Sequence, residues 1–267
     1  MKLPKIGFGT WELAPSVCKA SVLKAIETGY RFIDTAQIYG NEAQVGEAIA
    51  ASPVPRDDLI IATKIWITQL KPKNVLKSAA ISLQKLQVKT IDILYVHWPF
   101  SLTYKAKETL RAFSQLVDEG KVSSIGVANF NPALVDEAID VLKGYGKSLF
   151  VVQVEHHPML QQRVMREHLQ KRNVNLVAYS PLARGDVVNV PKIQQIAKKH
   201  NVTPSQVSLS WIMDHGAIPI PKATSEAHIK DNFAAQGLKL DKEDITLIDD
   251  IKVKRRKVNI PFLRPKW

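Results

Sequence analysis

The stretch Arg31–Gly40, RFIDTAQIYG, contains a short apolar run that ends in an acid, Asp34, and reaches a tyrosine five residues later at Tyr39. A strand that ends in a carboxylate and leads into a loop tyrosine is typical of how a parallel β/α barrel presents functional groups. Taken alone, the same pattern is also typical of a turn-capping acid followed by a packed tyrosine. The other strands of the chain decide between these interpretations.

The composition is that of a globular protein that needs no disulfide. The chain has 267 residues, 45% apolar and 23% charged, which suits one large α/β domain or two small ones. No stretch approaches the ~18–20 apolar residues of a membrane span, and the N-terminus lacks the apolar region of a signal peptide. The single cysteine, Cys18, cannot form an internal disulfide, so we expect a cytoplasmic protein with no membrane partner.

A formal net charge of +12 leaves nucleic acid, acidic lipid and a small anionic ligand open as partners. The basic residues are spread along the chain, with one tight cluster at Lys252–Lys257. The sequence has no zinc-ligand spacing, no DNA-binding motif and no aromatic-basic platform for single strands. We therefore predict a solvated basic surface, with no nucleic acid partner and no metal site.

One unit recurs along the chain, a short apolar strand followed by an amphipathic helix. No low-complexity segment, long linker or change in composition interrupts it, so residues 1–267 are predicted to form a single domain. Eight strands are predicted, at Lys5–Thr10, Arg31–Thr35, Leu59–Ile65, Ile91–His97, Ser123–Ala128, Leu149–Glu155, Asn175–Ser180 and Ala217–Pro221.

Capping residues indicate where the helices between these strands begin and end. Asn131-Pro132 and Thr203-Pro204 each place a capping side chain before a first-turn proline, and Gln206 is predicted to complete a capping box with Thr203. Glycines that suit left-handed helix ends follow three predicted helices, at Gly29, Gly120 and Gly216.

Eight strands alternating with helices predict parallel strands joined by right-handed crossovers. The predicted fold is a single (β/α)8 TIM barrel with an extra C-terminal helix and tail, and its active site is expected at the carboxyl ends of the strands. The competing fold, an open doubly wound sheet, usually has fewer strands, and this chain has no glycine-rich G-x-G-x-x-G turn. The first strand has the weakest strand propensity, because Gly7 and Gly9 alternate within it.

Seven of the predicted strands end in polar or charged residues. In a barrel these residues form a ring around one mouth, and burying so many polar groups is costly unless the rim has a function. In chain order they are Asp34, Lys64, His97, Asn129, Gln153 with Glu155, Tyr179 with Ser180, and Lys222.

The residue types in this ring suggest proton transfer to an oxygen. Asp34 and Lys64 lie on adjacent predicted strands and can form a partly buried ion pair. An ammonium beside a phenol favours the phenolate, so Lys64 is predicted to lower the pKa of Tyr39 from its ordinary ~10. His97 can donate a hydrogen bond to a substrate oxygen. Residue types alone leave carbonyl reduction, isomerisation and dehydration open, and they also allow a purely structural ion pair and a histidine that only packs beside Trp98.

The motifs around these residues resemble those of the aldo-keto reductases, and the likeness runs from Lys5 to Trp267. The chain is similar in particular to the small, short-loop, prokaryotic-type aldehyde or diketo-acid reductases. The matching motifs are GFGTW at Gly7–Trp11, DTAQIYGNE at Asp34–Glu42, TKIW at Thr63–Trp66, HWP at His97–Pro99, EGKVSSIGVANF at Glu119–Phe130, VEHHPMLQQ at Val154–Gln162, AYSPLARG at Ala178–Gly185, IPK at Ile220–Lys222 and VNIPFLRPKW at Val258–Trp267.

The resemblance implies NAD(P)H-dependent reduction of aldehydes and ketones, with the nicotinamide cofactor bound across the barrel mouth. It makes Tyr39 the general acid, with Lys64 lowering its pKa, and it implies that Asp34 holds Lys64 and that His97 positions the carbonyl. The implied cofactor contacts are Asn129 and Gln153 on the carboxamide, Tyr179 on the nicotinamide ring, Ser180 and Leu182 at the pyrophosphate segment, Lys222, Thr224 and His228 at the 2′-phosphate end, and Asp231 and Asn232 at the adenine.

The phosphate-binding end departs from the family pattern. Ala223 replaces a frequent serine, for which Thr224 or Ser225 partly substitutes, and His228 stands where an arginine usually pairs with the phosphate. Histidine is only partly charged near neutral pH and lacks the guanidinium fork, so phosphate recognition rests mainly on Lys222. NADP(H) is therefore the favoured cofactor and NAD(H) the alternative.

The loops that surround the predicted mouth are short, so we expect an open pocket in a monomer. Such a pocket suits small or polar aldehydes, dicarbonyls and sugar-derived carbonyls. Its predicted wall is aromatic and consists of Trp11, Tyr39, Trp66 and Trp98, with Phe262 and Trp267 from the tail.

Two other functions compete with a reductase. The first is a catalytically weak, nicotinamide-binding redox sensor or regulatory subunit with the same fold. The enzyme is preferred over it because all four catalytic positions are filled and no partner-binding domain is attached. The second is a nucleic acid binder, which would associate in a strongly salt-dependent way.

Overall fold

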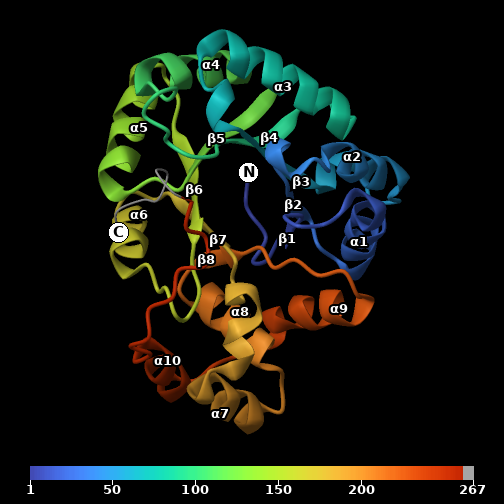
Figure 1. Ribbon diagram of the computed structural model, residues 1–267, viewed down its shortest axis with the longest axis vertical. Coiled ribbons are helices and arrows are strands. Elements are labelled where there is room, and N and C mark those ends of the chain that lie inside the picture. The colour runs from blue at the N-terminus through green and yellow to red at the C-terminus, as the bar shows by residue number, and fades with distance from the viewer. Residues whose placement is uncertain (261–267) are drawn as a thin grey trace.

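A computed structural model describes residues 1–260 and places eight parallel strands in one sheet, in chain order from β1 to β8. The sheet closes on itself, because the amides of Gly7 and Gly9 donate to the carbonyls of Pro219 (2.9 Å) and Pro221 (3.0 Å). In Figure 1 the strands surround the centre of the view and helices form an outer ring. The predicted (β/α)8 barrel is confirmed.

Each strand overlaps its predicted segment, and β6 matches it at both ends. The strand with the weakest propensity, β1, is also the shortest. Phe262 and Trp267, which were predicted to wall the pocket, lie outside the described residues. The strands are β1 (Phe8–Gly9), β2 (Phe32–Asp34), β3 (Ile60–Ile65), β4 (Ile91–Val96), β5 (Val122–Ala128), β6 (Leu149–Glu155), β7 (Asn175–Tyr179) and β8 (Ala217–Pro219).

Helices connect successive strands and also follow the last one. The α-helices are α1 (Pro15–Thr28), α2 (Glu42–Ala51), α3 (Pro72–Leu86), α4 (Ala106–Asp118), α5 (Pro132–Gly144), α6 (Arg163–Gln170), α7 (Pro191–His200), α8 (Pro204–Asp214), α9 (Glu226–Ala234) and α10 (Lys242–Asp249). Short 3-10 helices are η1 (Gln37–Tyr39), η2 (Arg56–Asp58), η3 (Ile67–Gln69), η4 (Ala183–Asn189) and η5 (Ala235–Gly237).

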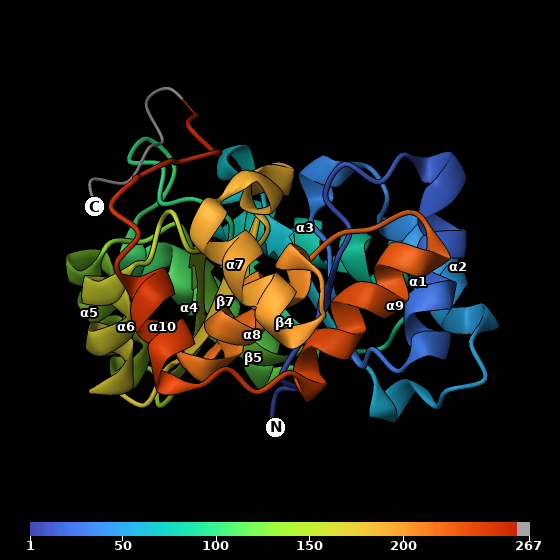
Figure 2. The same ribbon diagram turned by 90° about the horizontal axis from the view of Figure 1, so that it is seen from below.

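The C-terminal part of the chain departs from a plain repeat of strand and helix. Two helices, α7 and α8, connect β7 to β8, and α10 is the predicted extra C-terminal helix. In Figures 1 and 2 the segment after α10 turns back towards α6 and rises along that side of the barrel. Within residues 1–260, no helix has both the length and the apolar character needed to cross a membrane.

The core has two parts, one inside the barrel and one between the sheet and the helices. The inner part is a cluster of buried side chains that come mostly from different strands. Glycine is needed where β1 meets the last strand, because a Cβ on Gly9 would lie 2.7 Å from the carbonyl oxygen of Ile220. The residue that lowers the strand propensity of β1 therefore permits the barrel to close. The inner cluster is Phe32, Ala62, Ile93, Tyr95, Ala128, Val151, Val177 and Ile220.

The predicted helix boundaries are largely confirmed. Asn131 accepts from the amide of Leu134 (2.9 Å), and the three predicted glycines have positive φ. Thr203 also caps α8, but the predicted capping box with Gln206 is wrong, because the Gln206 side chain donates to Asp231 of α9 instead. A capping box that was not predicted begins α10, between Asp241 and Asp244.

Candidate active site

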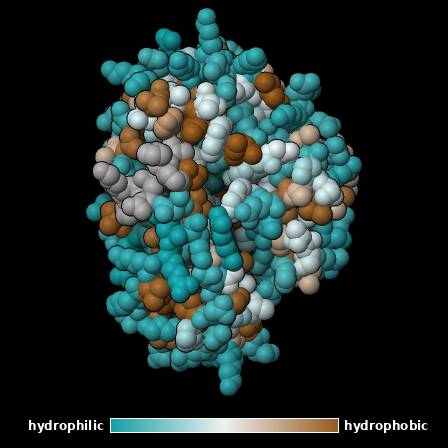
Figure 3. Space-filling view, in the orientation of Figure 1, coloured by the Kyte–Doolittle hydropathy of each residue, from teal (hydrophilic) through white to brown (hydrophobic). Residues whose placement is uncertain are grey.

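A pocket of about 750 Å³ opens at the carboxyl ends of the strands. The face in Figure 3 is hollowed near its centre, where hydrophobic and hydrophilic side chains meet. Most of the predicted site residues line this pocket, so the structure brings together residues from nearly every strand. They are Trp11, Asp34, Tyr39, Trp66, His97, Trp98, Asn129, Gln153, Tyr179, Ser180, Leu182 and Lys222.

A fully buried ion pair lies beneath this pocket. Lys64 Nζ on β3 contacts Asp34 Oδ1 at the end of β2, and the two side chains are 1% and 2% exposed. Lys64 also donates to the carbonyl of Thr35 (2.8 Å), and Gln153 Nε2 donates to the other oxygen of Asp34 (2.8 Å). Burial lowers the pKa of the Lys64 ammonium, and the Asp34 charge opposes that shift. The predicted pair is present, but it is buried more completely than expected.

Tyr39 ends η1 and extends this chain of contacts into the pocket, since its Oη lies 3.4 Å from Lys64 Nζ. The predicted lowering of the Tyr39 pKa is wrong for this structure. Burial raises the pKa well above its ordinary value, and the nearby Asp34 carboxylate adds to the rise. Tyr39 is therefore a protonated phenol at neutral pH, with a hydroxyl that can donate.

His97 follows β4 and lies beside both Tyr39 and an aromatic wall. Its ring makes edge-to-face contacts with Tyr39 (centroids 5.9 Å apart) and Trp66 (5.1 Å). Burial, followed by the Lys64 charge, holds the pKa of His97 well below its ordinary value. The ring is neutral near pH 7 and carries one N–H. Its Nδ1 has no hydrogen-bond partner within residues 1–260, so His97 is more than a satisfied packing residue.

Asn129, Gln153 and Tyr179 form one connected side of the pocket. Asn129 Nδ2 donates to the carbonyl of His97 (2.9 Å), and Tyr179 Oη donates to Asn129 Oδ1 (2.8 Å). Asn129 adopts a positive φ of 64° at the end of β5, which turns the chain into the following loop. The two amide groups and the phenol are therefore fixed before any ligand binds.

Two residues that position the loop carrying Tyr39 were missed by the sequence reasoning. The buried Asn41 donates to the carbonyls of Thr10 (2.9 Å) and Leu13 (3.0 Å) and accepts from Thr35 (2.9 Å), so it ties the loops after β1 and β2 together. Gln37 anchors η1 to α3 through the carbonyl of Ser78 (3.1 Å). The amide of Asn41, one residue after Gly40, was a usable signal, because a loop asparagine often caps turns.

The loop after β7 crosses the pocket towards the loop after β1. Ser180 has a positive φ of 47°, which bends the chain as it leaves the strand, and Leu182 lies against the pocket. The guanidinium of Arg184 in η4 stacks on the indole of Trp11, 4.5 Å from its centroid. Arg184 was not singled out from the sequence, and the stacking brings a cation to the rim of the pocket.

The residues expected to contact the 2′-phosphate and adenine of the cofactor do not all line the pocket. Lys222 lines the pocket, whereas Thr224 and His228 are exposed near the start of α9 and do not line it. Asp231 is half-buried and accepts from the hydroxyl of Thr203 (2.8 Å), and Asn232 is buried. Their contacts with a cofactor stay a prediction.

A segment near the C-terminus also lines the pocket, whereas the sequence analysis expected the tail to contribute through Phe262 and Trp267. Residues Lys257, Val258, Asn259 and Ile260 contribute to the wall. The basic cluster Lys252–Lys257 leads directly into this segment. Its charges meet acidic groups of the same chain, including Asp250 and Asp186.

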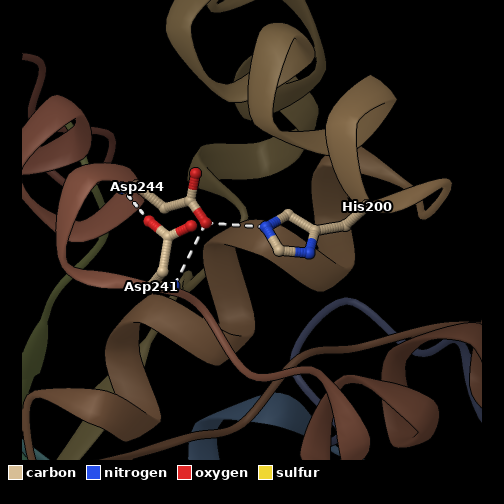
Figure 4. A group of neighbouring side chains, drawn as sticks. All are labelled: His200, Asp241 and Asp244. Atoms are coloured by element: carbon tan, nitrogen blue, oxygen red, sulfur yellow. Dashed lines mark hydrogen bonds and ion pairs between the residues drawn. The ribbon is translucent and has the colours of Figure 1, made fainter.

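A second cluster of titratable groups lies away from the barrel mouth. His200, Asp241 and Asp244 each place a ligand atom within 4.8 Å of the others (Figure 4). Asp244 accepts from His200 Nε2 (2.6 Å) and Lys199 Nζ (2.9 Å), and Asp241 contacts the same ammonium (2.5 Å). Because the Lys199 ammonium already contacts both carboxylates, the cluster acts as a link between α7 and α10.

Comparison with known proteins adds a family to this geometry. The profile of the Aldo/keto reductase family matches residues 5–253. The chain is 38% identical over 268 aligned residues to methylglyoxal reductase DkgB of Escherichia coli O157:H7, with 100% of both chains covered. It is 36% identical to 9,11-endoperoxide prostaglandin H2 reductase of Trypanosoma cruzi, over 96% of this chain and 90% of the relative.

Solved structures agree with this match. An aldo-keto reductase, MGS-M4, from a Medee basin deep-sea metagenome library superposes with a TM-score of 0.90 at 34% identity and covers 100% of this chain and 97% of its own. The aldose reductase of Schistosoma japonicum gives a TM-score of 0.92 at 29% identity, over 99% and 95% of the two chains.

Proposed function

The chain belongs to the aldo/keto reductase family, and from that premise we propose that it reduces small aldehydes and ketones to alcohols with Tyr39 as the general acid. The family match and the named reductase relatives make it an oxidoreductase that acts on carbonyl groups. A nicotinamide cofactor is the hydride source that the family uses.

The observation that carries the proposal is the chain of contacts from Asp34 through Lys64 to Tyr39, which is buried at one end and opens into the pocket at the other. A protonated phenol can give its proton to a carbonyl oxygen as that oxygen gains negative charge. The Lys64 ammonium at 3.4 Å then stabilises the phenolate that remains. Asp34 holds the ammonium in place.

His97 supports the orientation of the substrate. The ring is neutral because burial lowers its pKa, so it can donate one N–H to the carbonyl oxygen without bringing a second positive charge beside Lys64. Its edge-to-face contact with Tyr39 keeps the two donors on the same side of the pocket. Two donors that converge on one oxygen are suited to a carbonyl substrate.

The pocket fits a nicotinamide cofactor in its donor set. The side-chain amides of Asn129 and Gln153 match a carboxamide, the Tyr179 ring offers a stacking surface, and a volume of about 750 Å³ lies within the range of ligand pockets. The cofactor, when bound, supplies the hydride. Lys222 is the cation expected to meet a 2′-phosphate, and we propose NADP(H) as the favoured cofactor.

The substrate wall is apolar and partly open to solvent. Trp11, Trp66 and Trp98 line it, and Ile38, 52% exposed beside Tyr39, lies at its edge. A flat apolar wall accepts short carbonyl compounds without demanding a specific hydrogen-bond pattern. Together with the likeness to methylglyoxal reductases, this favours small 2-oxoaldehydes such as methylglyoxal.

The deciding experiment measures oxidation of NADPH and NADH by the purified protein with methylglyoxal, a short aliphatic aldehyde and an aromatic aldehyde, in wild type and Tyr39→Phe. We expect NADPH to be used faster than NADH. Tyr39→Phe should lower kcat by about 10²- to 10⁴-fold, since it removes the general acid. The Kd for NADPH, measured by fluorescence titration, should change little.

The outcomes separate the competing functions. Wild-type cofactor binding without turnover would replace the reductase with the redox sensor. Full activity of Tyr39→Phe would remove Tyr39 as the acid. Equal or preferred use of NADH would mean that Lys222 alone does not select the 2′-phosphate. Exposed Val17→Ala on α1 serves as the matched control and should behave as wild type.

A further inference from the structure

Glu155 is a buried carboxylate that the proposed reaction does not use. It is the last residue of β6 and is 1% exposed. Among the residues that the structure describes, it does not line the pocket, although its neighbour in the sheet, Tyr179, does. A buried carboxylate is costly unless donors surround it, so its partners indicate its role.

Three N–H groups surround this carboxylate. Oε1 accepts from the amide of Lys257 (2.5 Å), and Oε2 accepts from the amide of Val258 (2.9 Å). His157 Nε2 lies 3.0 Å from Oε1. Two of the three donors are consecutive backbone amides of the C-terminal segment, roughly a hundred residues away along the chain. Backbone amides fix the path of that segment whatever its side chains are.

Further contacts guide the same segment towards Glu155. The amide of Arg255 donates to the carbonyl of Met159 (3.0 Å), and its guanidinium pairs with Asp186 of η4 (3.0 Å). Lys257 Nζ also contacts Asp186. The segment from Lys252 to Ile260 is thus held on one side by the loop after β6 and on the other by the loop after β7. In Figure 1 it runs beside β6 and α6.

We propose that Glu155 is a positioning residue that fixes the C-terminal wall of the substrate pocket, and this rests on the proposed reductase function. Residues Lys257–Ile260 line the pocket, and the first two of them donate the backbone amides that Glu155 accepts. The Lys257 charge is directed to Asp186, so the wall presents Val258, Asn259 and Ile260 to a ligand. Glu155 therefore acts on substrate binding through the backbone, without touching the substrate.

The test is Glu155→Gln, which keeps the size of the side chain but replaces one accepting oxygen with an NH₂ that faces an amide donor. We expect the KM for the carbonyl substrate to rise about 10-fold, because a charge-assisted contact is lost. The kcat should stay within about 3-fold, since Tyr39, Lys64 and His97 keep their places. Hydrogen exchange of the amides in residues 251–260 should become about 10-fold faster.

Glu167→Gln, an exposed carboxylate on the adjacent α6, is the matched control and should leave both readouts unchanged. If Glu155→Gln fails to fold, Asp186→Asn weakens the same segment from the partly exposed side and should raise the KM about 3-fold with faster exchange. An unchanged KM and unchanged exchange in a folded variant would overturn the proposal.

The two proposals fail in different ways. A wild-type protein without carbonyl turnover would contradict the reductase function, while hydrogen exchange of residues 251–260 would still report whether Glu155 holds the segment. A wild-type protein that turns over, with a Glu155→Gln variant whose kcat falls as much as its KM rises, would assign Glu155 to the chemistry and overturn its positioning role.

Discussion

At the residue scale, Tyr39 shows why a neighbouring charge does not decide a pKa by itself. The Lys64 ammonium lies 3.4 Å away, but Asp34 contacts the same ammonium. The Asp34 carboxylate offsets that ammonium and itself raises the pKa of Tyr39. Burial then dominates, and it raises the pKa of Tyr39. The phenol is therefore protonated at neutral pH, as the general-acid role that we propose for Tyr39 requires.

This direction of shift predicts the pH dependence of the reaction. Reduction needs the protonated phenol, and a raised pKa extends the protonated range upwards. We expect kcat for carbonyl reduction to stay level from about pH 7 to about pH 10. The measurement is a pH profile with saturating reduced cofactor, with Tyr39→Phe as the control that has no acid to lose. A decline centred below about pH 9 would show that the ammonium outweighs burial.

At the scale of elements, the packing of α2 against α3 depends on one glycine. A Cβ on Gly46 would lie 2.4 Å from the carbonyl oxygen of Lys85 and 2.6 Å from the carbonyl carbon of Leu86. These are backbone atoms, which cannot move aside as a flexible side-chain end can. The glycine therefore sets how closely the two helices approach, behind the strands that carry Asp34 and Lys64.

Gly46→Ala should destabilise the protein although alanine is the better helix former. The gain in helix propensity is about 1 kcal/mol, whereas overpacking against backbone costs about 1–3 kcal/mol or more. Gly144→Ala in α5 is the matched control, because nothing lies within 4 Å of its added Cβ, and it should be neutral or stabilise by up to about 1 kcal/mol. Chemical denaturation measures both, and equal effects would contradict the packing argument.

At the scale of the whole molecule, buried histidines couple folding to pH. His156 donates from Nδ1 to the carbonyl of Leu160 (3.2 Å) and packs on Trp211, with its ring centroid 5.3 Å away. Its Nε2 is buried with no partner inside the described part of the chain. Burial lowers the pKa of His156 to about 3. The ring can take up a proton at mildly acidic pH only when the surrounding structure opens.

The sign of the resulting pH effect follows from this depressed pKa. Between an unfolded pKa of about 6.5 and a folded pKa of about 3, the unfolded chain binds the extra proton, so stability falls as the pH falls. His156 contributes up to about 1.4 kcal/mol per pH unit. His156→Asn keeps a donor towards Leu160 but cannot be protonated, so its free energy of unfolding should fall less steeply with acid. Parallel slopes for the two proteins would contradict the prediction.

The sequence by itself determined the strand order, the barrel and most residues at its mouth. The strands and the polar residues that end them are local features, because a short apolar run that ends in Asp34 or His97 itself indicates the end of a strand. The motifs that resemble those of the family agree with the same barrel and the same site residues. Residues Asn41 and Gln37 were missed because their partners, such as Thr10 and Ser78, are distant in sequence.

Only the tertiary structure decided the rest. The sign of the Tyr39 pKa shift depends on burial, which no local pattern encodes. The Gln206 side chain on α8 donates to Asp231 on α9 and does not cap its own helix, because folding brings these two helices together. The path of residues Lys257–Ile260 to the pocket depends on Glu155, which lies roughly a hundred residues earlier. Contacts between distant segments exist only once the barrel has closed.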